Sequence, residues 1–239
     1  MNFRCRGLAF TILSFFLFSS FYFKKTLEKI SMSVSTRTLE KGKVINVKGD
    51  MYYSVYGGLM VTHITFPVEY VMITNSKGEL KIYNIKENNV VQGQSAGSSS
   101  ENSFLYYFLS GKIQDMGLKN MGFQLKGSKI DENRVITKWL PNIENFSKIG
   151  SAELVHEDYF PIYLAYLDVK KKPLQKIYYY NYQKTAELSI PLTITEIVYI
   201  GKKDSIITKR TYSDIKTNEQ VDDTWFHFKI PANASIVKQ

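Results

Sequence analysis

Short runs of β-branched and aromatic residues, each ended by turn residues, occupy most of this chain and constrain its fold more than any other feature. In residues 69–84, two such runs flank the sequence N-S-K-G from Asn75 to Gly78, which predicts a β-hairpin. Another pair of runs lies before and after Gly57 and Gly58. Runs of this kind cover 43–49, 50–56, 59–66, 69–75, 79–85, 88–92, 122–128, 134–140, 151–157, 161–169, 175–182, 192–200, 205–212 and 224–230.

The predicted strands are joined by tight turns with almost no helical segments between them, so we expect an antiparallel meander. Apolar residues alternate with polar ones along several runs. In residues 224–230, for example, Phe226, Phe228 and Ile230 are predicted to share one face of a strand. A long sheet with one apolar face and few helices to cover it closes on itself or curls around something. The sequence therefore predicts a mainly β protein with a few helices.

Three segments differ from this pattern. Residues 24–40 are polar with sparse apolar positions, and we expect a short helix or a tether there. Residues 93–103 form a small-polar connector. The apolar run at 104–109 (FLYYFL) predicts a short helix that begins near Ser100 or Asn102 and ends at Gly111. Because this helix is apolar nearly all round, we expect it to cover the open side of the sheet as part of a lid.

The N-terminus has the pattern of an export signal. Arg4 and Arg6 precede an apolar run at 8–23, and two lysines follow it. Residues 1–23 are therefore predicted to be a signal peptide or an uncleaved signal anchor. The only cysteine, Cys5, precedes the apolar run, whereas a lipidated cysteine would have to follow it. The exported part thus has no thiol for a disulfide, a metal site or a nucleophile.

A literal match to the G-x-S-x-G motif of α/β-hydrolases occurs at residues 93–97, with Ser95 in the position of the nucleophile. Asp168 and either His156 or His227 would complete the order Ser, Asp, His. The motif needs a strand-to-helix turn in a parallel sheet, whereas Ser95 lies in a connector within an antiparallel meander. We interpret residues 93–97 as a loop and expect no catalytic residue.

Metal, cofactor and nucleic-acid sites are not indicated by the sequence. The three histidines are scattered without ligand spacing, and no P-loop, dinucleotide or calcium motif is present. The formal net charge of +9 includes four basic residues around the apolar N-terminal run, and no basic stripe with interleaved aromatic residues follows. Methionines gather in the first half of the chain, where they suit either an ordinary core or a surface that accepts varied apolar guests.

Three stretches match the pattern of a known family. Thr65-Phe66-Pro67 corresponds to a T-x-P step that follows a strand, and residues 69–84 match the run E-x-h-h-h-x-D-G-x-x-h-x-h-Y-(D/N) with one extra turn residue. Residues 226–234 are similar to the ending F-x-F-x-P-P-x-G-V. In these features the chain resembles the LolA family of periplasmic lipoprotein carriers. The family's W-x-R-P step aligns near Val55 and Tyr56, where this chain has no arginine.

The resemblance implies an incomplete antiparallel β-barrel at residues 41–239, with an apolar concave face covered by short helices. It also implies a periplasmic, monomeric, non-enzymatic carrier without a cofactor. Such a carrier binds the acyl chains of a lipoprotein or lipid and moves them towards the outer membrane, with an inner-membrane release machinery and an outer-membrane acceptor as candidate partners. The residues expected in the cavity and lid are Met60, Ile64, Phe66, Met72, Leu80, Ile82, Phe104, Leu105, Phe108, Phe226 and Phe228.

Two functions of other classes stay open at this point. One is an exported lipid-active hydrolase that uses Ser95. The other is a membrane-anchored module whose apolar face binds a protein partner.

Overall fold

The computed structural model describes residues 26–94, 100, 104–142, 148–184, 189–201 and 204–237. The predicted signal peptide or anchor at 1–23 and the serine of the G-x-S-x-G match, Ser95, lie outside the described residues. Within the described ranges, no helix is long and apolar enough to cross a membrane.

The first half of the chain forms six strands with a short 3-10 turn between the second and the third. They are β1 (Lys29–Glu40), β2 (Lys43–Ser54), η1 (Tyr56–Gly58), β3 (Leu59–Phe66), β4 (Tyr70–Thr74), β5 (Glu79–Asn84) and β6 (Asn89–Gln94). The hairpin expected around N-S-K-G is confirmed as β4–β5, in which the Asn75 side chain accepts hydrogen bonds from the backbone N–H groups of Lys77 and Glu79. The turn at Gly57 and Gly58 is also confirmed.

The second half begins with one short α-helix and continues as a longer meander. Its elements are α1 (Phe104–Leu109), β7 (Phe123–Asp131), β8 (Arg134–Pro141), β9 (Ser151–Glu157), β10 (Phe160–Leu167), β11 (Pro173–Lys184), β12 (Ser189–Ile200) and β13 (Asp204–Thr217). After β13 come η4 (Asn218–Gln220), η5 (Asp223–His227) and β14 (Ser235–Val237). The predicted helix at 104–109 is confirmed.

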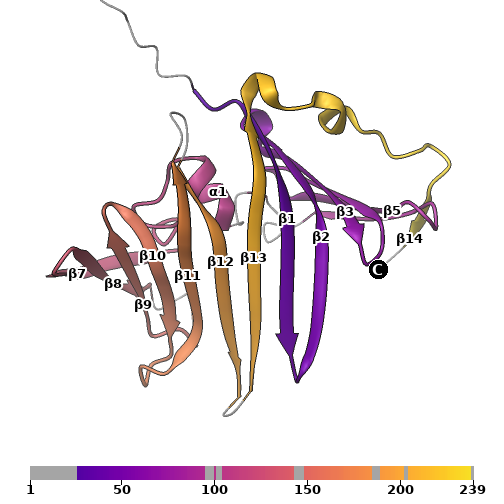
Figure 1. The fold of residues 1–239 in the computed structure, drawn as a ribbon. Coiled ribbons are helices and arrows are strands. Elements are labelled where there is room, and N and C mark those ends of the chain that lie inside the picture. Colours follow the sequence, from indigo (N-terminus) through magenta and orange to yellow (C-terminus); the bar gives the residue numbers. More distant parts are fainter. Residues whose placement is uncertain are drawn as a thin grey trace, which may run out of the picture.

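All fourteen strands of the described chain belong to one sheet, in the order β14-β6-β5-β4-β3-β2-β1-β13-β12-β11-β10-β9-β8-β7. The two meanders meet where β1 pairs with β13, and every ladder is antiparallel except the short one between β14 and β6. The sheet does not close, because β14 and β7 remain at its two ends. Figure 1 shows the sheet curled, with α1 inside the curve. The predicted fold, a mainly β incomplete barrel, is confirmed.

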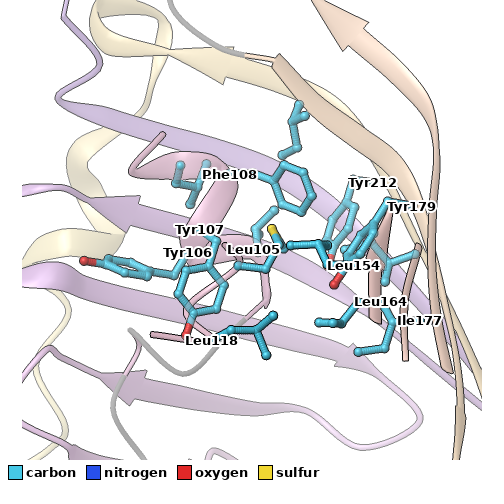
Figure 2. Packing of buried hydrophobic residues seen from close by; sticks show 14 of the residues in the cluster. Leu105, Tyr106, Tyr107, Phe108, Leu118, Leu154, Leu164, Ile177, Tyr179 and Tyr212 are labelled. Atoms are coloured by element: carbon cyan, nitrogen blue, oxygen red, sulfur yellow. The ribbon is translucent and has the colours of Figure 1, made fainter. Parts of the chain in front are cut away.

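The core lies between the concave side of the sheet and a plug, the segment 104–122 that contains α1. We call this side the inner face; it carries Met51 and Tyr53 on β2 and Ile177 and Tyr179 on β11, among others. Figure 2 shows Phe108 of α1 pointing towards the strand residues Tyr179 and Tyr212, whereas Tyr106 points away from them. The ring of Phe108 lies edge-on to that of Tyr179, with centroids 5.3 Å apart. Burial of these apolar side chains is the main force that holds the plug in the curve.

Two expectations for the N-terminal part are wrong. Residues 29–40 were expected to be helical or a tether, but they form β1, which pairs with β2 on one side and β13 on the other. Ile30, Met32 and Val34 alternate with serines, which is the period of a strand with one buried face. Likewise, 43–49 and 50–56 are not two strands, because β2 runs through Gly49. A Cβ at Gly49 would lie 2.2 Å from the carbonyl oxygen of His63, so glycine permits this close approach of β3.

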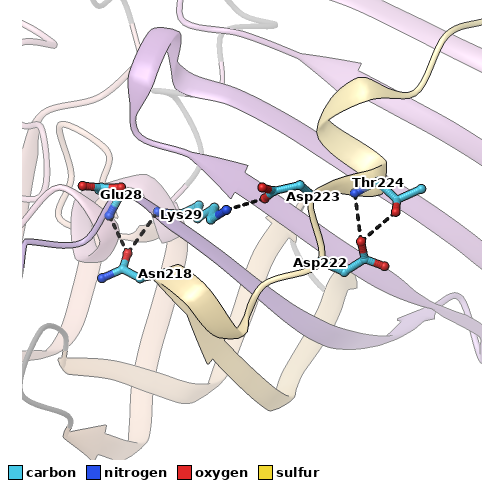
Figure 3. A network of polar contacts seen from close by, with 6 residues as sticks. All are labelled: Glu28, Lys29, Asn218, Asp222, Asp223 and Thr224. Atoms are coloured by element: carbon cyan, nitrogen blue, oxygen red, sulfur yellow. Dashed lines mark hydrogen bonds and ion pairs between the residues drawn. The ribbon is translucent and has the colours of Figure 1, made fainter.

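The start of β1 is tied to the end of β13 by one buried side chain. Asn218 accepts a hydrogen bond from the backbone N–H of Glu28 at 2.8 Å and donates one to the carbonyl oxygen of Thr26 at 3.0 Å. Figure 3 shows this contact beside the ion pair of Lys29 with Asp223. The arrangement fixes the point at which the chain leaves the sheet after β13.

The C-terminal segment 218–234 crosses the outer face, the side of the sheet opposite to α1, before β14 pairs with β6. Trp225 stacks on His63 with ring centroids 4.3 Å apart and on Tyr52 at 5.8 Å. Tyr52 follows Met51 on β2, so its side chain points away from the inner face. The strand predicted at 224–230 is wrong: residues 223–227 form η5, because the Asp222 carboxylate accepts hydrogen bonds from the N–H and hydroxyl of Thr224 and caps a turn.

Candidate functional site

A cavity of about 440 Å³ opens on the inner face, where the two meanders meet. Its walls come from β1 to β4, from β12 and β13, and from α1. The side chains that line it are Val34, Thr36, Met51, Met60, Thr62, Ile64, Met72, Leu105, Ile194, Glu196, Arg210 and Tyr212. Seven of these twelve are aliphatic or methionine side chains, so the cavity offers apolar contact with a small polar part. A volume of this size lies within the usual range for ligand sites, ~300–1,000 Å³.

Strand register explains why these residues meet. Met51 on β2 is opposite Thr62 on β3, and Thr62 is opposite Met72 on β4. Because side chains alternate between faces along a strand, every second residue of these strands points towards the cavity. Methionine side chains are flexible and polarizable, so this wall can adapt to apolar guests of different shape.

The plug forms the remaining wall. Leu105 lines the cavity, while Phe108 packs deeper, against Tyr179 and Tyr182. Residues 105–109 are all buried. The hydroxyl of Tyr179 is buried and has no hydrogen-bond partner among the described residues. Burial raises the pKa of this phenol well above its usual value, so the hydroxyl stays protonated.

A second hollow, of about 560 Å³, lies on the other side of the plug. It is bounded by the β7–β8 and β9–β10 hairpins and by Ile113 and Gln114 of the plug. The imidazole Nε2 of His156 lies 2.9 Å from the carbonyl oxygen of Ile113, which joins this end of the plug to β9. Although this hollow is larger, charged turn residues such as Glu132 and Asp158 form part of its rim. Among the described residues no methionine lines this hollow, whereas Met51, Met60 and Met72 line the first cavity.

Among the described residues that line the first cavity, Arg210 and Glu196 are the charged ones. They lie on adjacent strands, β13 and β12, and the guanidinium Nη1 donates a hydrogen bond to Glu196 Oε2 at 3.1 Å. The other carboxylate oxygen, Oε1, accepts from the side-chain amide of Gln175 at 2.7 Å. The Glu196 side chain is 16% exposed and that of Arg210 is 34% exposed. The arginine is thus the more accessible member of the pair.

The residues expected in the cavity and lid are only partly brought together. Met60, Ile64, Met72 and Leu105 line the cavity. Ile82 is opposite Met72 and Leu80 is opposite Thr74, so both share the inner face beyond the cavity. Phe108 belongs to the buried core. The helix position of Phe104 is as predicted, but its side chain lies outside the described part.

Three of the eleven expected residues lie elsewhere. Phe66 is 51% exposed at the end of β3 and does not line the cavity. The placement of Phe226 and Phe228 in the cavity is wrong. Phe226 contacts Tyr52, and the ring of Phe228 lies 6.2 Å from that of Tyr83, both on the outer face. The two phenylalanines therefore pack on aromatic side chains of the outer face and not in the cavity.

The cavity walls that β1, β12 and β13 contribute were not predicted from the sequence. Val34 and Thr36 belong to the segment expected to be a helix or tether, so its wrong assignment removed them from consideration. The alternation Ile30, Met32, Val34 was the signal that could have revealed them. No local sequence pattern predicts that Arg210 and Glu196 line the cavity, because their contact depends on the pairing of β12 with β13.

The described residues offer no constellation for hydrolysis. The Asp168 carboxylate accepts hydrogen bonds from the backbone N–H groups of Lys170 and Lys172, both at 2.8 Å, and so shapes its own turn. His156 Nε2 is engaged by the plug. No group of three or more His, Cys, Asp or Glu side chains in the described part could hold a metal ion. The cavity on the inner face is therefore the candidate functional site.

Comparison with solved structures places this architecture among known folds. A DUF1329 family protein from Desulfovibrio piger is 14% identical, with a TM-score of 0.56 and coverage of 85% of this chain and 91% of that protein. A domain from Vibrio parahaemolyticus assigned to outer membrane lipoprotein sorting is 13% identical, with a TM-score of 0.58 and coverage of 84% and 89%.

A LolA superfamily protein from Nitrosomonas europaea is 12% identical, with a TM-score of 0.55 and coverage of 83% of this chain and 90% of that protein. No protein-family profile and no curated protein sequence matches the chain. At these identities the likeness concerns the fold, so the chain has a divergent form of the LolA-like fold.

Proposed function

We propose that this protein is a non-enzymatic carrier that binds acyl chains of a lipoprotein or lipid in the cavity on the inner face. The observation that carries the proposal is the cavity itself: an apolar, methionine-rich hollow in an incomplete barrel, bordered by a short helix. The likeness in fold to a LolA superfamily protein and to a lipoprotein-sorting domain supports the same function. The carrier acts as a monomer in the periplasm and needs no cofactor.

The energetics of acyl transfer fit such a site. Removing a methylene from water is worth ~0.8 kcal/mol, so one long acyl chain represents roughly 12 kcal/mol. A carrier must offer nearly this much apolar contact, because otherwise the chain stays in the membrane. It must not offer much more, because delivery to an outer-membrane acceptor would fail. Loading from an inner-membrane release machinery and delivery then require no acid, base or metal.

The plug, residues 104–122, acts as the lid in this proposal. Leu105 borders the cavity, and the helix is held by apolar packing. The arginine of the family's W-x-R-P step has no counterpart near Val55 and Tyr56, and the side chain of Tyr56 is exposed. A lid held by apolar contacts can be displaced by an acyl chain that replaces those contacts.

Displacement of the neutral dye Nile red from the full-length protein by hexadecanoic acid tests the proposal. Met72→Trp fills the cavity from β4, so we expect it to weaken hexadecanoic acid binding at least tenfold, the equivalent of ~1.4 kcal/mol or more. The matched control is Ile73→Trp, the next residue on the same strand, whose side chain lies on the outer face. It should bind as the unchanged protein does.

Native mass spectrometry of protein purified from its own host complements this test and should detect a co-purifying acylated species. Absence of acyl binding, or equal binding by both tryptophan variants, would contradict the proposal. Capture of a protein without acyl binding would favour the interaction-module alternative. Ester hydrolysis lost on Ser95→Ala would favour the hydrolase.

A further inference from the structure

Arg210 is an unusual residue in the wall of an acyl-chain cavity. A charged side chain there loses hydrogen bonds to water, and hydrogen bonds to other groups must replace them. On the inner face Arg210 is directly opposite Thr36 on β1 and Ile194 on β12, which also line the cavity. Glu196 supplies one partner, at 3.1 Å from Nη1. The guanidinium edge formed by Nε and Nη2 has no hydrogen-bond partner among the described residues. A planar edge of this kind matches two oxygens of one carboxylate or phosphate.

Glu196 is placed so that Arg210 keeps its position when a second anion approaches. Gln175 on β11 donates to Glu196 Oε1 at 2.7 Å, so both carboxylate oxygens accept a hydrogen bond and the carboxylate is held between β11 and Arg210 on β13. The ion pair therefore fixes the guanidinium from one side. The side chain of Arg210 is also the more exposed of the two, 34% against 16% for Glu196, so Arg210 is the member of the pair that a ligand can reach.

We propose that the cavity selects acyl lipids with an anionic head group and that Arg210 binds that group. This inference rests on the proposed acyl-binding function, and it adds the class of lipid that the site takes. The acyl chain lies among Met60, Met72 and Leu105, while the head-group oxyanion accepts hydrogen bonds from Nε and Nη2 of Arg210. Glu196 reduces the net positive charge, so the preference for an anion is moderate and the bound lipid can be released.

Three probes of equal chain length test the inference in the full-length protein: hexadecanoic acid, hexadecyl phosphate and hexadecanol, each displacing Nile red. We expect the two anionic lipids to bind about tenfold more tightly than the alcohol, as one charge-assisted contact predicts. Arg210→Gln should bring the ratio of affinities close to one. The relative affinity of carboxylate and phosphate shows which anionic head group fits better.

Two further variants make the result specific. Glu196→Gln keeps the size of the side chain but removes the competing negative charge, so the preference for anionic lipids should increase several-fold. Lys209→Gln removes a positive charge from the neighbouring position on β13, which is exposed on the outer face, and should leave the preference intact. Circular dichroism confirms that each variant is folded.

An equal affinity for all three probes in the unchanged protein would overturn the anionic preference while leaving acyl binding in place. A preference that survives Arg210→Gln, or that Lys209→Gln also removes, would overturn the role of Arg210. Failure of all three probes to displace the dye would instead overturn the proposed function and this inference together.

Discussion

At the scale of single residues, the described part of the inner face contains one buried side-chain polar atom without a hydrogen-bond partner. Tyr179 is fully buried against Phe108, and its hydroxyl has no hydrogen-bond partner in the described part of the chain. Tyr182, two residues further along β11, differs because its hydroxyl donates to the carbonyl oxygen of Pro161. Removing the hydroxyl group at each position therefore shows how much a hydrogen-bonded hydroxyl contributes to stability, apart from the aromatic ring.

We expect Tyr179→Phe to leave the free energy of unfolding unchanged or to raise it by about 1 kcal/mol, because a buried hydroxyl without a partner costs desolvation energy. Tyr182→Phe should lower it by about 1 kcal/mol through loss of a hydrogen bond. Urea unfolding followed by circular dichroism measures both. Equal destabilisation by the two variants would show that the Tyr179 hydroxyl has a partner after all.

At the scale of elements, the sequence predicts most described strands from their local alternation, and helix α1 from the residues at which it begins and ends. The strands of the second meander and the helix at 104–109 could be placed from alternation and turn residues alone. Segments 29–40 and 224–230 failed for opposite reasons. The serines of β1 hide a strand that is stabilised by neighbours distant in sequence, β2 and β13. The phenylalanines of 224–230 imitate a strand, although Asp222 and Thr224 cap a turn there.

The candidate site could be predicted only where it depends on local alternation. Met60, Ile64 and Met72 belong to predicted strands whose apolar positions face one side. Arg210 and Glu196 meet through the register of β12 and β13, which no local pattern specifies. The face on which a strand residue lies changes with a register shift of one position, so long-range contacts decide cavity membership.

One glycine of the plug, Gly117, lies against the side chain of Tyr107 on α1. Gly117 has φ of +77°, and a Cβ there would lie 2.1 Å from the hydroxyl oxygen of Tyr107. Gly111 has a similar φ of +68°, yet a Cβ there would meet no atom within 4 Å. Alanine at either position carries the same backbone strain, about 1–2 kcal/mol. Only at position 117 must the side chain of Tyr107 also shift.

We therefore expect Gly117→Ala to lower the free energy of unfolding by at least about 1 kcal/mol more than Gly111→Ala does, because overpacking adds to strain. Amide hydrogen exchange of residues 105–109 should become faster in Gly117→Ala than in Gly111→Ala. Similar exchange in both variants would mean that the contact with Tyr107 does not hold the plug in place.

At the scale of the whole molecule, the cavity lies across the junction of two meanders. Its walls include Met51 and Met72 from the first meander and Ile194 and Tyr212 from the second. The second hollow, by contrast, is bordered by the hairpins β7–β8 and β9–β10 and by the plug, all from the later half of the chain. A ligand in the first cavity therefore contacts both halves, and one in the second hollow contacts a single half.

Bound hexadecanoic acid at 100 times its dissociation constant should stabilise the native state by about 2.7 kcal/mol. For a chain of this size that corresponds to a rise of roughly 5–10 °C in Tm, measured by thermal unfolding.

Hydrogen exchange locates the bound acyl chain. Where amides exchange by local opening, bound hexadecanoic acid should protect β2–β4 and β12–β13 together, and Met72→Trp should abolish this protection. Protection confined to β8–β10 and residues 113–114 would instead locate the acyl chain in the second hollow. The inner face would then still bind lipid, but the wall of methionines and Arg210 would not be the part that holds it.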